Sequence, residues 1–451
     1  MSSIAEFVLT HCKNTSVNLD SGDLPKALVT VSIEELDNTL ECLNTDDYAA
    51  AMAYLLAAKG KKLPKLHVQD DEDEMDMHVD QLDAPDRTLH VTFLLQVCSY
   101  VGRLRSLPTE PRETTKLSDL VKLAVHVGIA LGQTIRLVHP LRQLILFWQN
   151  SKLESSSITH ANKYALTPFH GSFALACLHA KCYHAALPIL NQPIFEVAMP
   201  HAIQSIHVLE YFYYGGMLFT GLKQFRDAST FFLTAITSPA HALSAIAIEA
   251  YKKYILVSLL ATGDVPPLPK SAPLIVSRNI DSHVAPFLAF ATAFKSLDIV
   301  QLHDSAADIS GGGHGGLVKQ CIAALKKKRV QQLTLTYTTV SLAKLAAEIG
   351  ATDVEAESCL LDMIEARDVA AAIEKRENMV VFHAQDDVDE VLLQSMIENT
   401  VMSTTRLREM DVAVTKNPKY IGKVKDKRAS KYTDTDESTW LGATQHASSS
   451  G

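Results

Sequence analysis

Long hydrophobic runs and a basic excess are both missing from this chain of 451 residues. Its longest apolar runs, such as Ile255 to Ala261, fall far short of the roughly 18 residues that a membrane-spanning helix needs. Lys and Arg number 42 against 51 Asp and Glu, a formal charge of -9, which argues against nucleic acid or an anionic membrane as the main partner. We therefore expect a soluble protein that binds neither.

Cysteine pairs are missing as well. The seven cysteines, an odd number, include no Cys-x-x-Cys motif, so reduced thiols in a cytoplasmic or nuclear protein are expected. The first residues, Met1 to Phe7, lack the basic start and the long apolar core of a secretion signal. The sequence therefore predicts a protein of the cytoplasm and the nucleus.

Motifs for catalysis are also missing. The chain has no His-Glu-x-x-His motif and no Gly-x-Ser-x-Gly nucleophile turn. The glycine run from Ser310 to Gly316 lacks the Lys-Ser/Thr of a phosphate loop, and this favours a flexible linker. The densest group of possible metal ligands, from Cys177 to His184, has no recognised zinc spacing, which favours a structural role. We predict no catalytic residue, no cofactor and no metal.

The length and the apolar content predict several packing units made of helices. Apolar residues recur at spacings of three and four up to about Ala58 and again from Leu89 to Trp148, with breaks expected at Pro108, Pro111 and Pro140. Between these regions, Lys59 to Pro64 and the acidic run Asp70 to Asp76 predict a loop. That run is interpreted as a solvated loop, with docking of a basic partner as the alternative.

A later segment follows the pattern of a tetratricopeptide repeat, in which small residues let two helices approach closely. The matching residues are Phe212, Gly216, Phe219, Ala228, Phe232, Ala235 and Pro239. Repeats of this kind bury their apolar faces only by stacking on their neighbours, and the stack ends on a capping element. We therefore predict a helical solenoid with a cap.

The stretch from Lys319 to His383 has the element order of a winged helix. The first expected elements are a helix that closes near Arg329, a strand over Leu333–Val340 and a helix over Leu342–Ile349 between Ser341 and Gly350. A third helix after the capping box Thr352–Glu355 and a hairpin of residues 371–374 and 379–383 follow. This domain would form the cap of the solenoid.

The third helix of this domain is acidic. The acidic residues Asp353, Glu355, Glu357, Asp362, Glu365 and Asp368 surround the one cation Arg367. A helix that enters the major groove needs Lys and Arg on its exposed face, so DNA reading is disfavoured. Protein contact remains, in which the short strands offer unpaired backbone groups to the sheet of a neighbour.

A long final helix is predicted over residues 386–415. Its apolar stripe consists of Val388, Leu392, Met396, Met402, Leu407 and Met410. Such a stripe needs a partner, and the alternative is that the helix folds back on the solenoid. Residues 416–451 are predicted to be a disordered tail, with a basic cluster between Lys419 and Lys431 that could serve docking or nuclear import.

This order of parts resembles the PCI-domain family, which contains subunits of the proteasome lid, the COP9 signalosome and the translation initiation factor three complex. The blocks Tyr214–Met217, Glu249–Leu259, Gly316–Cys321 and Arg406–Asp411 carry the resemblance and are most similar to the signalosome branch. The expected fold class is mainly α: a TPR-like helical-repeat solenoid capped by a winged-helix (PCI) domain and followed by a long C-terminal helix. The expected divisions are residues 1–200 for N-terminal repeats, 201–383 for the PCI domain (helical bundle 201–316, winged helix 317–383), 386–415 for the final helix and 416–451 for the tail.

The resemblance implies a non-catalytic scaffold subunit in an assembly that removes a ubiquitin-like modifier from cullins, with hydrolysis on a different, metal-dependent subunit. The implied partners are other PCI and MPN subunits and, indirectly, cullin-RING ligases. A scaffold subunit of the proteasome lid or of the initiation factor complex is the alternative. The residues predicted at protein interfaces are Leu342, Leu345, Ile373, Val381, Phe382, Leu392, Met396, Met402, Leu407 and Met410.

Overall fold

The structure is a computed structural model. It describes residues 30–64, 84–104, 111–150, 165–192, 203–240, 242–383 and 390–418, with isolated positions outside these ranges. The predictions for the acidic run Asp70 to Asp76 and for nearly all of the tail lie outside the described residues. The chain divides into two units, a body that ends at Ala384 and a C-terminal unit that contains the final helix. Each unit is described by itself.

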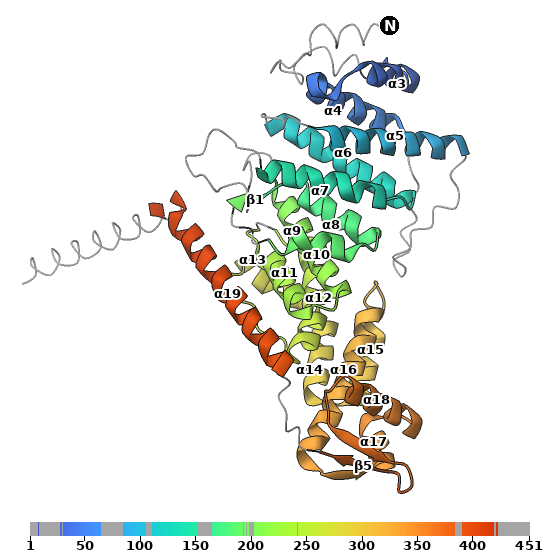
Figure 1. The fold of residues 1–451 in the computed structure, drawn as a ribbon, viewed down its shortest axis with the longest axis vertical. Helices are drawn as coiled ribbons and strands as arrows, with labels where there is room; N and C mark the ends of the chain where they lie inside the picture. The colour runs from blue at the N-terminus through green and yellow to red at the C-terminus, as the bar shows by residue number, and fades with distance from the viewer. Residues whose placement is uncertain are drawn as a thin grey trace, which may run out of the picture. The chain divides into compact units, whose positions relative to one another are not determined.

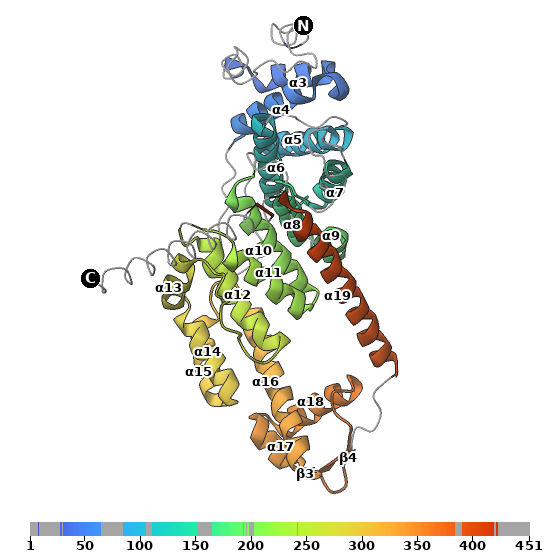
Figure 2. The same cartoon turned by 90° about the vertical axis from the view of Figure 1, so that its left-hand side faces the viewer.

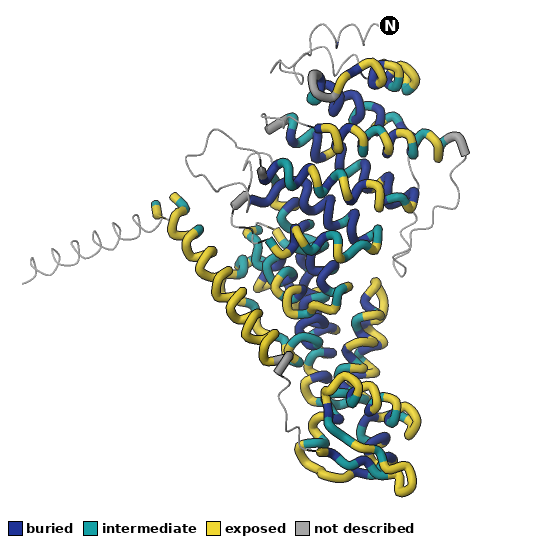
Figure 3. Tube along the Cα trace, in the orientation of Figure 1, coloured by how far each residue is buried: buried dark blue, intermediate teal, exposed yellow. Residues whose placement is uncertain are grey.

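The first part of the body is a stack of helices (Figures 1 and 2). Its helices are α3 (Ile33–Cys42), α4 (Thr45–Lys62), α5 (Ala84–Arg103), α6 (Pro111–Ala130), α7 (Ile135–Asn150), α8 (His170–His179), α9 (Tyr183–Leu190), α10 (Ser205–Gly221), α11 (Phe225–Thr237) and α12 (Ala245–Ala261). Buried residues concentrate where successive helices face one another (Figure 3). A short parallel pair, β1 (Ala165–Leu166) and β2 (Glu196–Val197), joins two of the connections.

The tetratricopeptide pattern is confirmed in the packing of α10 on α11. Ala228, Phe232 and Ala235 of α11 are buried, and Gly216 of α10 lies against the Phe232 ring. A Cβ atom on Gly216 would lie 2.7 Å from Cε1 of Phe232, closer than two carbon atoms can approach. Glycine is therefore required for this close helix contact.

Four more helices connect the stack to the winged helix, and α16 runs into that domain (Figure 2). They are α13 (Leu274–His283), α14 (Ala285–Ser296), α15 (Ile299–Ile309) and α16 (Gly315–Thr336). Helix α16 packs on α12 and α15 at its start, and Val330 near its end is in the core of the winged helix. One continuous helix therefore belongs to both parts of the body.

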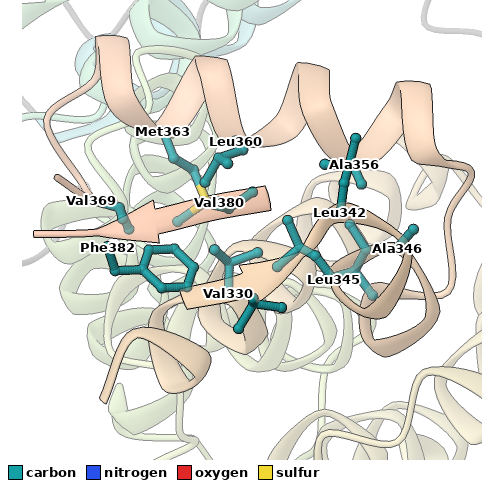
Figure 4. Close-up of a cluster of buried hydrophobic side chains, with 12 residues drawn as sticks. Val330, Leu342, Leu345, Ala346, Ala356, Leu360, Met363, Val369, Val380 and Phe382 are labelled. Atoms are coloured by element: carbon teal, nitrogen blue, oxygen red, sulfur yellow. The ribbon is translucent and has the colours of Figure 1, made fainter. Parts of the chain in front are cut away.

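The winged helix has a three-stranded antiparallel sheet in the order β3-β5-β4. Its elements are β3 (Thr339–Ser341), α17 (Leu342–Ile349), α18 (Asp353–Glu365), β4 (Ala371–Glu374) and β5 (Met379–Phe382). In the sheet register Val340 pairs with Val380 and Ile373 pairs with Val380 on the other side. The core between sheet and helices contains Leu360, Met363 and Val380 (Figure 4).

Local signals place α17 and α18 where they were predicted. The Ser341 hydroxyl accepts a hydrogen bond from the Lys344 N–H at 3.3 Å, and Gly350 ends α17 with a left-handed φ of 61°. The Thr352 N–H donates to the Glu355 carboxylate at 3.1 Å, which completes the expected capping box of α18. The predicted hairpin is confirmed as β4 and β5.

Several local predictions were wrong. Helix α16 continues to Thr336 and does not close near Arg329, so the strand expected over Leu333–Val340 shrinks to β3. Val330 and Leu333 pack on the winged-helix core, and this burial overrides the β propensity of the segment. Pro140 lies inside α7 and does not break it.

The loop expected from Lys59 to Pro64 is also shorter, because α4 continues to Lys62. Lys59 is fully buried and its ammonium donates to the Asp37 carboxylate and, at 2.9 Å, to the Gln96 side chain. A buried Lys requires such partners. The predicted flexible linker at the glycine run is instead a short turn from which Gly315 opens α16.

The C-terminal unit contains one helix of 27 residues, α19 (Glu390–Lys416), in agreement with the predicted final helix. The observed architecture is thus mainly helical, with stacked helices, a winged helix and a long last helix. The predicted fold class is confirmed.

Candidate protein interface

Helix α19 is exposed along most of its length (Figure 3). Several of its exposed side chains are large and apolar. Of the residues predicted from its stripe, Met396, Met402, Leu407 and Met410 are between 40% and 66% exposed. Leu392 lies in α19, but its side chain is outside the described part of the chain. Within the C-terminal unit taken by itself, these side chains are exposed to solvent.

The prediction missed five further exposed apolar residues of α19. They are Leu393, Ile397, Val401, Val412 and Val414. Leu393, Leu407 and Val414 are separated by multiples of seven residues, as are Met396 and Met410. These five residues form a heptad seam that Thr400 and Ser403 interrupt in the middle. The seven-residue spacing was the signal in the sequence that could have identified it.

The sheet of the winged helix has open edges. Within the described residues, β4 pairs only with β5, so the backbone groups on its other side lack strand partners. Ile373 of β4 and Val381 of β5 are half-buried. A four-residue edge with half-buried side chains can accept a strand or a side-chain contact from another protein.

Three residues predicted at the interface belong to the core instead. Leu342, Leu345 and Phe382 are buried in the winged helix, with Leu345 0% exposed. Their apolar spacing reflects contact with the helices and strands of their own domain. Burial therefore argues against direct contact of these three side chains with a partner.

The turn before α16 is fixed to α12 by a polar contact. Nε2 of the buried His314 lies 3.2 Å from Oε2 of Glu249, and its ring meets the Phe287 ring edge-on with centroids 5.1 Å apart. The hydrogen bond from His314, with the Lys252 ammonium at 2.6 Å, lowers the pKa of Glu249 to about 2. Gly312 and Gly313, with φ of 66° and 75°, provide the left-handed turn before His314.

The Cys177 to His184 segment forms no group of metal ligands within the described residues. Cys177 is buried in α8, and this burial raises the pKa of its thiol to about 12. His184 is exposed on α9. In the described ranges, no three His, Cys, Asp or Glu side chains are grouped as ligands for a metal ion.

The described residues contain no candidate membrane-spanning helix. Among the helices of the described residues, none combines the length and the apolar character that crossing a bilayer requires.

These features define a class of protein: a helical-repeat stack joined to a winged helix, as in PCI-domain proteins. A family model described as "COP9 signalosome complex subunit 3, N-terminal helical repeats" matches residues 23–276, and a PCI domain model matches residues 293–384. The chain belongs to the family of COP9 signalosome complex subunit 3. The helical-repeat family model ends at residue 276 and the PCI domain model begins at residue 293, both after the predicted domain boundary at residue 201. That boundary stays a prediction.

Two relatives support this assignment. A COP9 signalosome complex subunit 3 of Dictyostelium discoideum is 30% identical over 399 residues, which cover 86% of this chain and 88% of that protein. The protein of the same name from Arabidopsis thaliana is 31% identical over 376 residues, covering 77% and 83% respectively. The resemblance to the signalosome branch is confirmed, and both matches favour it over the alternatives in the proteasome lid and the initiation factor complex.

Proposed function

We propose that the chain is a non-catalytic scaffold subunit of a COP9 signalosome and supports the removal of a ubiquitin-like modifier from cullins. The bond cleavage takes place on a different, metal-dependent subunit. The partners are the other PCI and MPN subunits and, through them, cullin-RING ligases in the cytoplasm and nucleus. The exposed apolar surface of α19 is the observation that carries this proposal.

The heptad seam of α19 supports a helical bundle as the mode of contact. Leu393, Met396, Leu407, Met410 and Val414 form one side of the helix. Burying a single Leu or Met side chain contributes roughly 1.5–3 kcal/mol, so leaving all five in water is costly. Val401, Met402 and Val412 lie outside this seam, which favours contact with more than one neighbouring helix.

The winged helix supplies the second contact in this proposal. Its β4 edge is open in the described chain, with Ile373 on β4 itself and Val381 on the adjoining central strand β5. A neighbouring winged helix that packs against this edge would satisfy the backbone groups of β4. The continuous helix α16 would then hold the winged helix at a fixed angle to the helical repeats, so that the repeats project from the joined winged helices.

A seam variant tests the bundle. The full chain with Leu393→Asp and Leu407→Asp is co-expressed with sibling subunits. Native mass spectrometry then measures the mass of the assembly. The control has Ser277→Asp and Ser282→Asp, which add the same charge at exposed positions of α13, away from α19. The seam variant should lose most of its partners, and the control should keep them. Equal assembly of both variants would reject the bundle role.

A further inference from the structure

The outward face of α18 has two exposed apolar side chains. Val354 is 77% exposed and Leu361 is 51% exposed. They are seven residues apart, or about two helical turns, which places them on the same side of the helix roughly 10 Å apart. The opposite side, with Leu360 and Met363, packs on the core of the winged helix (Figure 4). The exposed pair is therefore no part of the domain's own packing.

Acidic side chains border this apolar pair. Asp362 and Glu365 are exposed, and Glu365 is four residues after Leu361, on the same side of the helix. Asp353 is exposed at the start of the helix. No Lys or Arg occurs anywhere in α18. The potential over this face is consequently negative, and a partner surface with Lys or Arg would be attracted to it.

The other carboxylates of α18 already have partners. Glu355 belongs to the capping box, and Glu357 accepts a salt bridge from Lys375 at 2.8 Å. For Asp353, Asp362 and Glu365, by contrast, the described residues provide no salt bridge within 4 Å. Within the described residues, the carboxylates of Asp353, Asp362 and Glu365 are thus without a salt-bridge partner.

We propose that the outward face of α18, centred on Val354 and Leu361, docks against a protein surface of a sibling subunit in which an apolar contact is flanked by Lys or Arg. This inference rests on the proposed scaffold function and adds a second, different surface to the β4 edge. A domain that offers two different surfaces forms head-to-tail contacts, so it can have one neighbour on each side. Phosphate-bearing partners are repelled by the same carboxylates that attract a cationic protein.

Photo-crosslinking in the assembled complex tests the proposal. A photoreactive phenylalanine analogue replaces Leu361 in the full chain, the complex is assembled with its sibling subunits and irradiated, and the crosslinked peptides are sequenced. We expect a crosslink to a sibling subunit, in a peptide that contains Lys or Arg, with a yield that falls as salt rises. A crosslink only to this chain, to nucleic acid or to a peptide without a cation would overturn the proposal.

Charge reversal supplies the matched comparison. Asp362→Lys with Glu365→Lys should lower the crosslink yield about tenfold, because like charges then face each other. Asp304→Lys with Asp308→Lys makes the same charge change on the exposed side of α15 and should leave the yield unchanged. An equal yield from both double variants would also overturn the proposal.

Native mass spectrometry of the same samples distinguishes failure of the α18 contact from failure of the proposed scaffold function. A complex that assembles fully but gives no crosslink from position 361 to a sibling rejects the α18 contact and leaves the scaffold function intact. A chain that does not join sibling subunits at all rejects the scaffold function itself.

Discussion

His314 and Glu249 join the turn before α16 to α12, with 3.2 Å between Nε2 and Oε2. Because α16 continues into the winged helix, this contact helps to fix that domain to the helical repeats. The Phe287 ring packs on the edge of the same imidazole. The glycine turn thus has a definite structural role, which is to insert His314 between α12 and α14.

Removing the charge of Glu249 is expected to make the free energy of unfolding less dependent on pH in the acidic range. The pKa of Glu249 falls from an ordinary value of 4.5 to about 2, chiefly through the hydrogen bond from His314. A lowered carboxyl pKa contributes stability that is present above about pH 4.5 and lost as the pH falls toward 2. Glu249→Gln should cost about 1 kcal/mol at pH 7, allowing for partial exposure, and less on acidification.

Urea unfolding of both proteins between pH 7 and about pH 3 measures this difference. Asp264→Asn is the control, because Asp264 is exposed and its salt bridge to Lys295 is open to solvent. A Glu249→Gln penalty that grows as the pH falls would contradict the prediction.

Buried His170 predicts a loss of stability in mild acid. Its Nδ1 accepts a hydrogen bond from the Thr167 N–H at 3.0 Å, and burial lowers its pKa from 6.5 to about 4. The unfolded chain therefore binds a proton between these values while the folded chain does not, so unfolding is favoured as the pH falls. The contribution is at most about 1.4 kcal/mol for each pH unit.

His170→Gln should be less stable at pH 7 but should lose less stability between pH 6.5 and 4. Part of the slope should remain, because burial also lowers the pKa values of His126, His179 and His207. His303→Gln at an exposed position of α15 is the control. The same slope in His170→Gln and in the unmodified chain would argue against this origin.

Core and edge positions of the winged helix should respond differently to truncation. Leu345→Ala removes a fully buried side chain and is expected to cost about 2–5 kcal/mol in unfolding free energy. Ile373→Ala, at a half-buried position of the edge strand β4, should cost less and should weaken partner binding more. Thermal unfolding and co-purification with sibling subunits measure the two effects. If Leu345→Ala instead weakened partner binding with little loss of stability, Leu345 would have to lie at an interface.

Glycine to alanine changes in two helices should have opposite effects. At Gly216 the new Cβ would meet the Phe232 ring at 2.7 Å, so overpacking of about 1–3 kcal/mol is expected. At Gly102, near the end of α5, a Cβ meets nothing within 4 Å, and better helix propensity should add up to about 1 kcal/mol. Melting temperatures provide the comparison, and two stabilising changes would contradict the close packing of α10 on α11.

Local chemistry made part of the fold predictable. Ser341, Gly350 and Thr352 mark helix ends through hydrogen bonds and backbone conformation that depend only on near neighbours. The end of α16 was missed because Val330 and Leu333 are held helical by a core built from later residues. The spacing of apolar residues within a short segment does not show such contacts with residues distant in the sequence.

The apolar surface of α19 was predictable from the sequence, whereas the burial of a similar stripe in the winged helix was not. An apolar stripe on α17 and one on α19 follow similar spacing, yet Leu345 is buried and Leu407 is exposed. Spacing identifies the apolar side of a helix, whereas the tertiary structure decides whether this chain or another protein covers it. Val354 and Leu361 were missed because two isolated residues form no stripe.

The most direct test of the scaffold account is the native mass of the chain in cell extract. The full chain carries an affinity tag and is purified under mild conditions, and native mass spectrometry records the species that contain it. The account predicts a large assembly with sibling subunits, and cleavage of modified cullin by that assembly but not by the isolated chain. A monomer as the main species, or cleavage by the isolated chain, would contradict it.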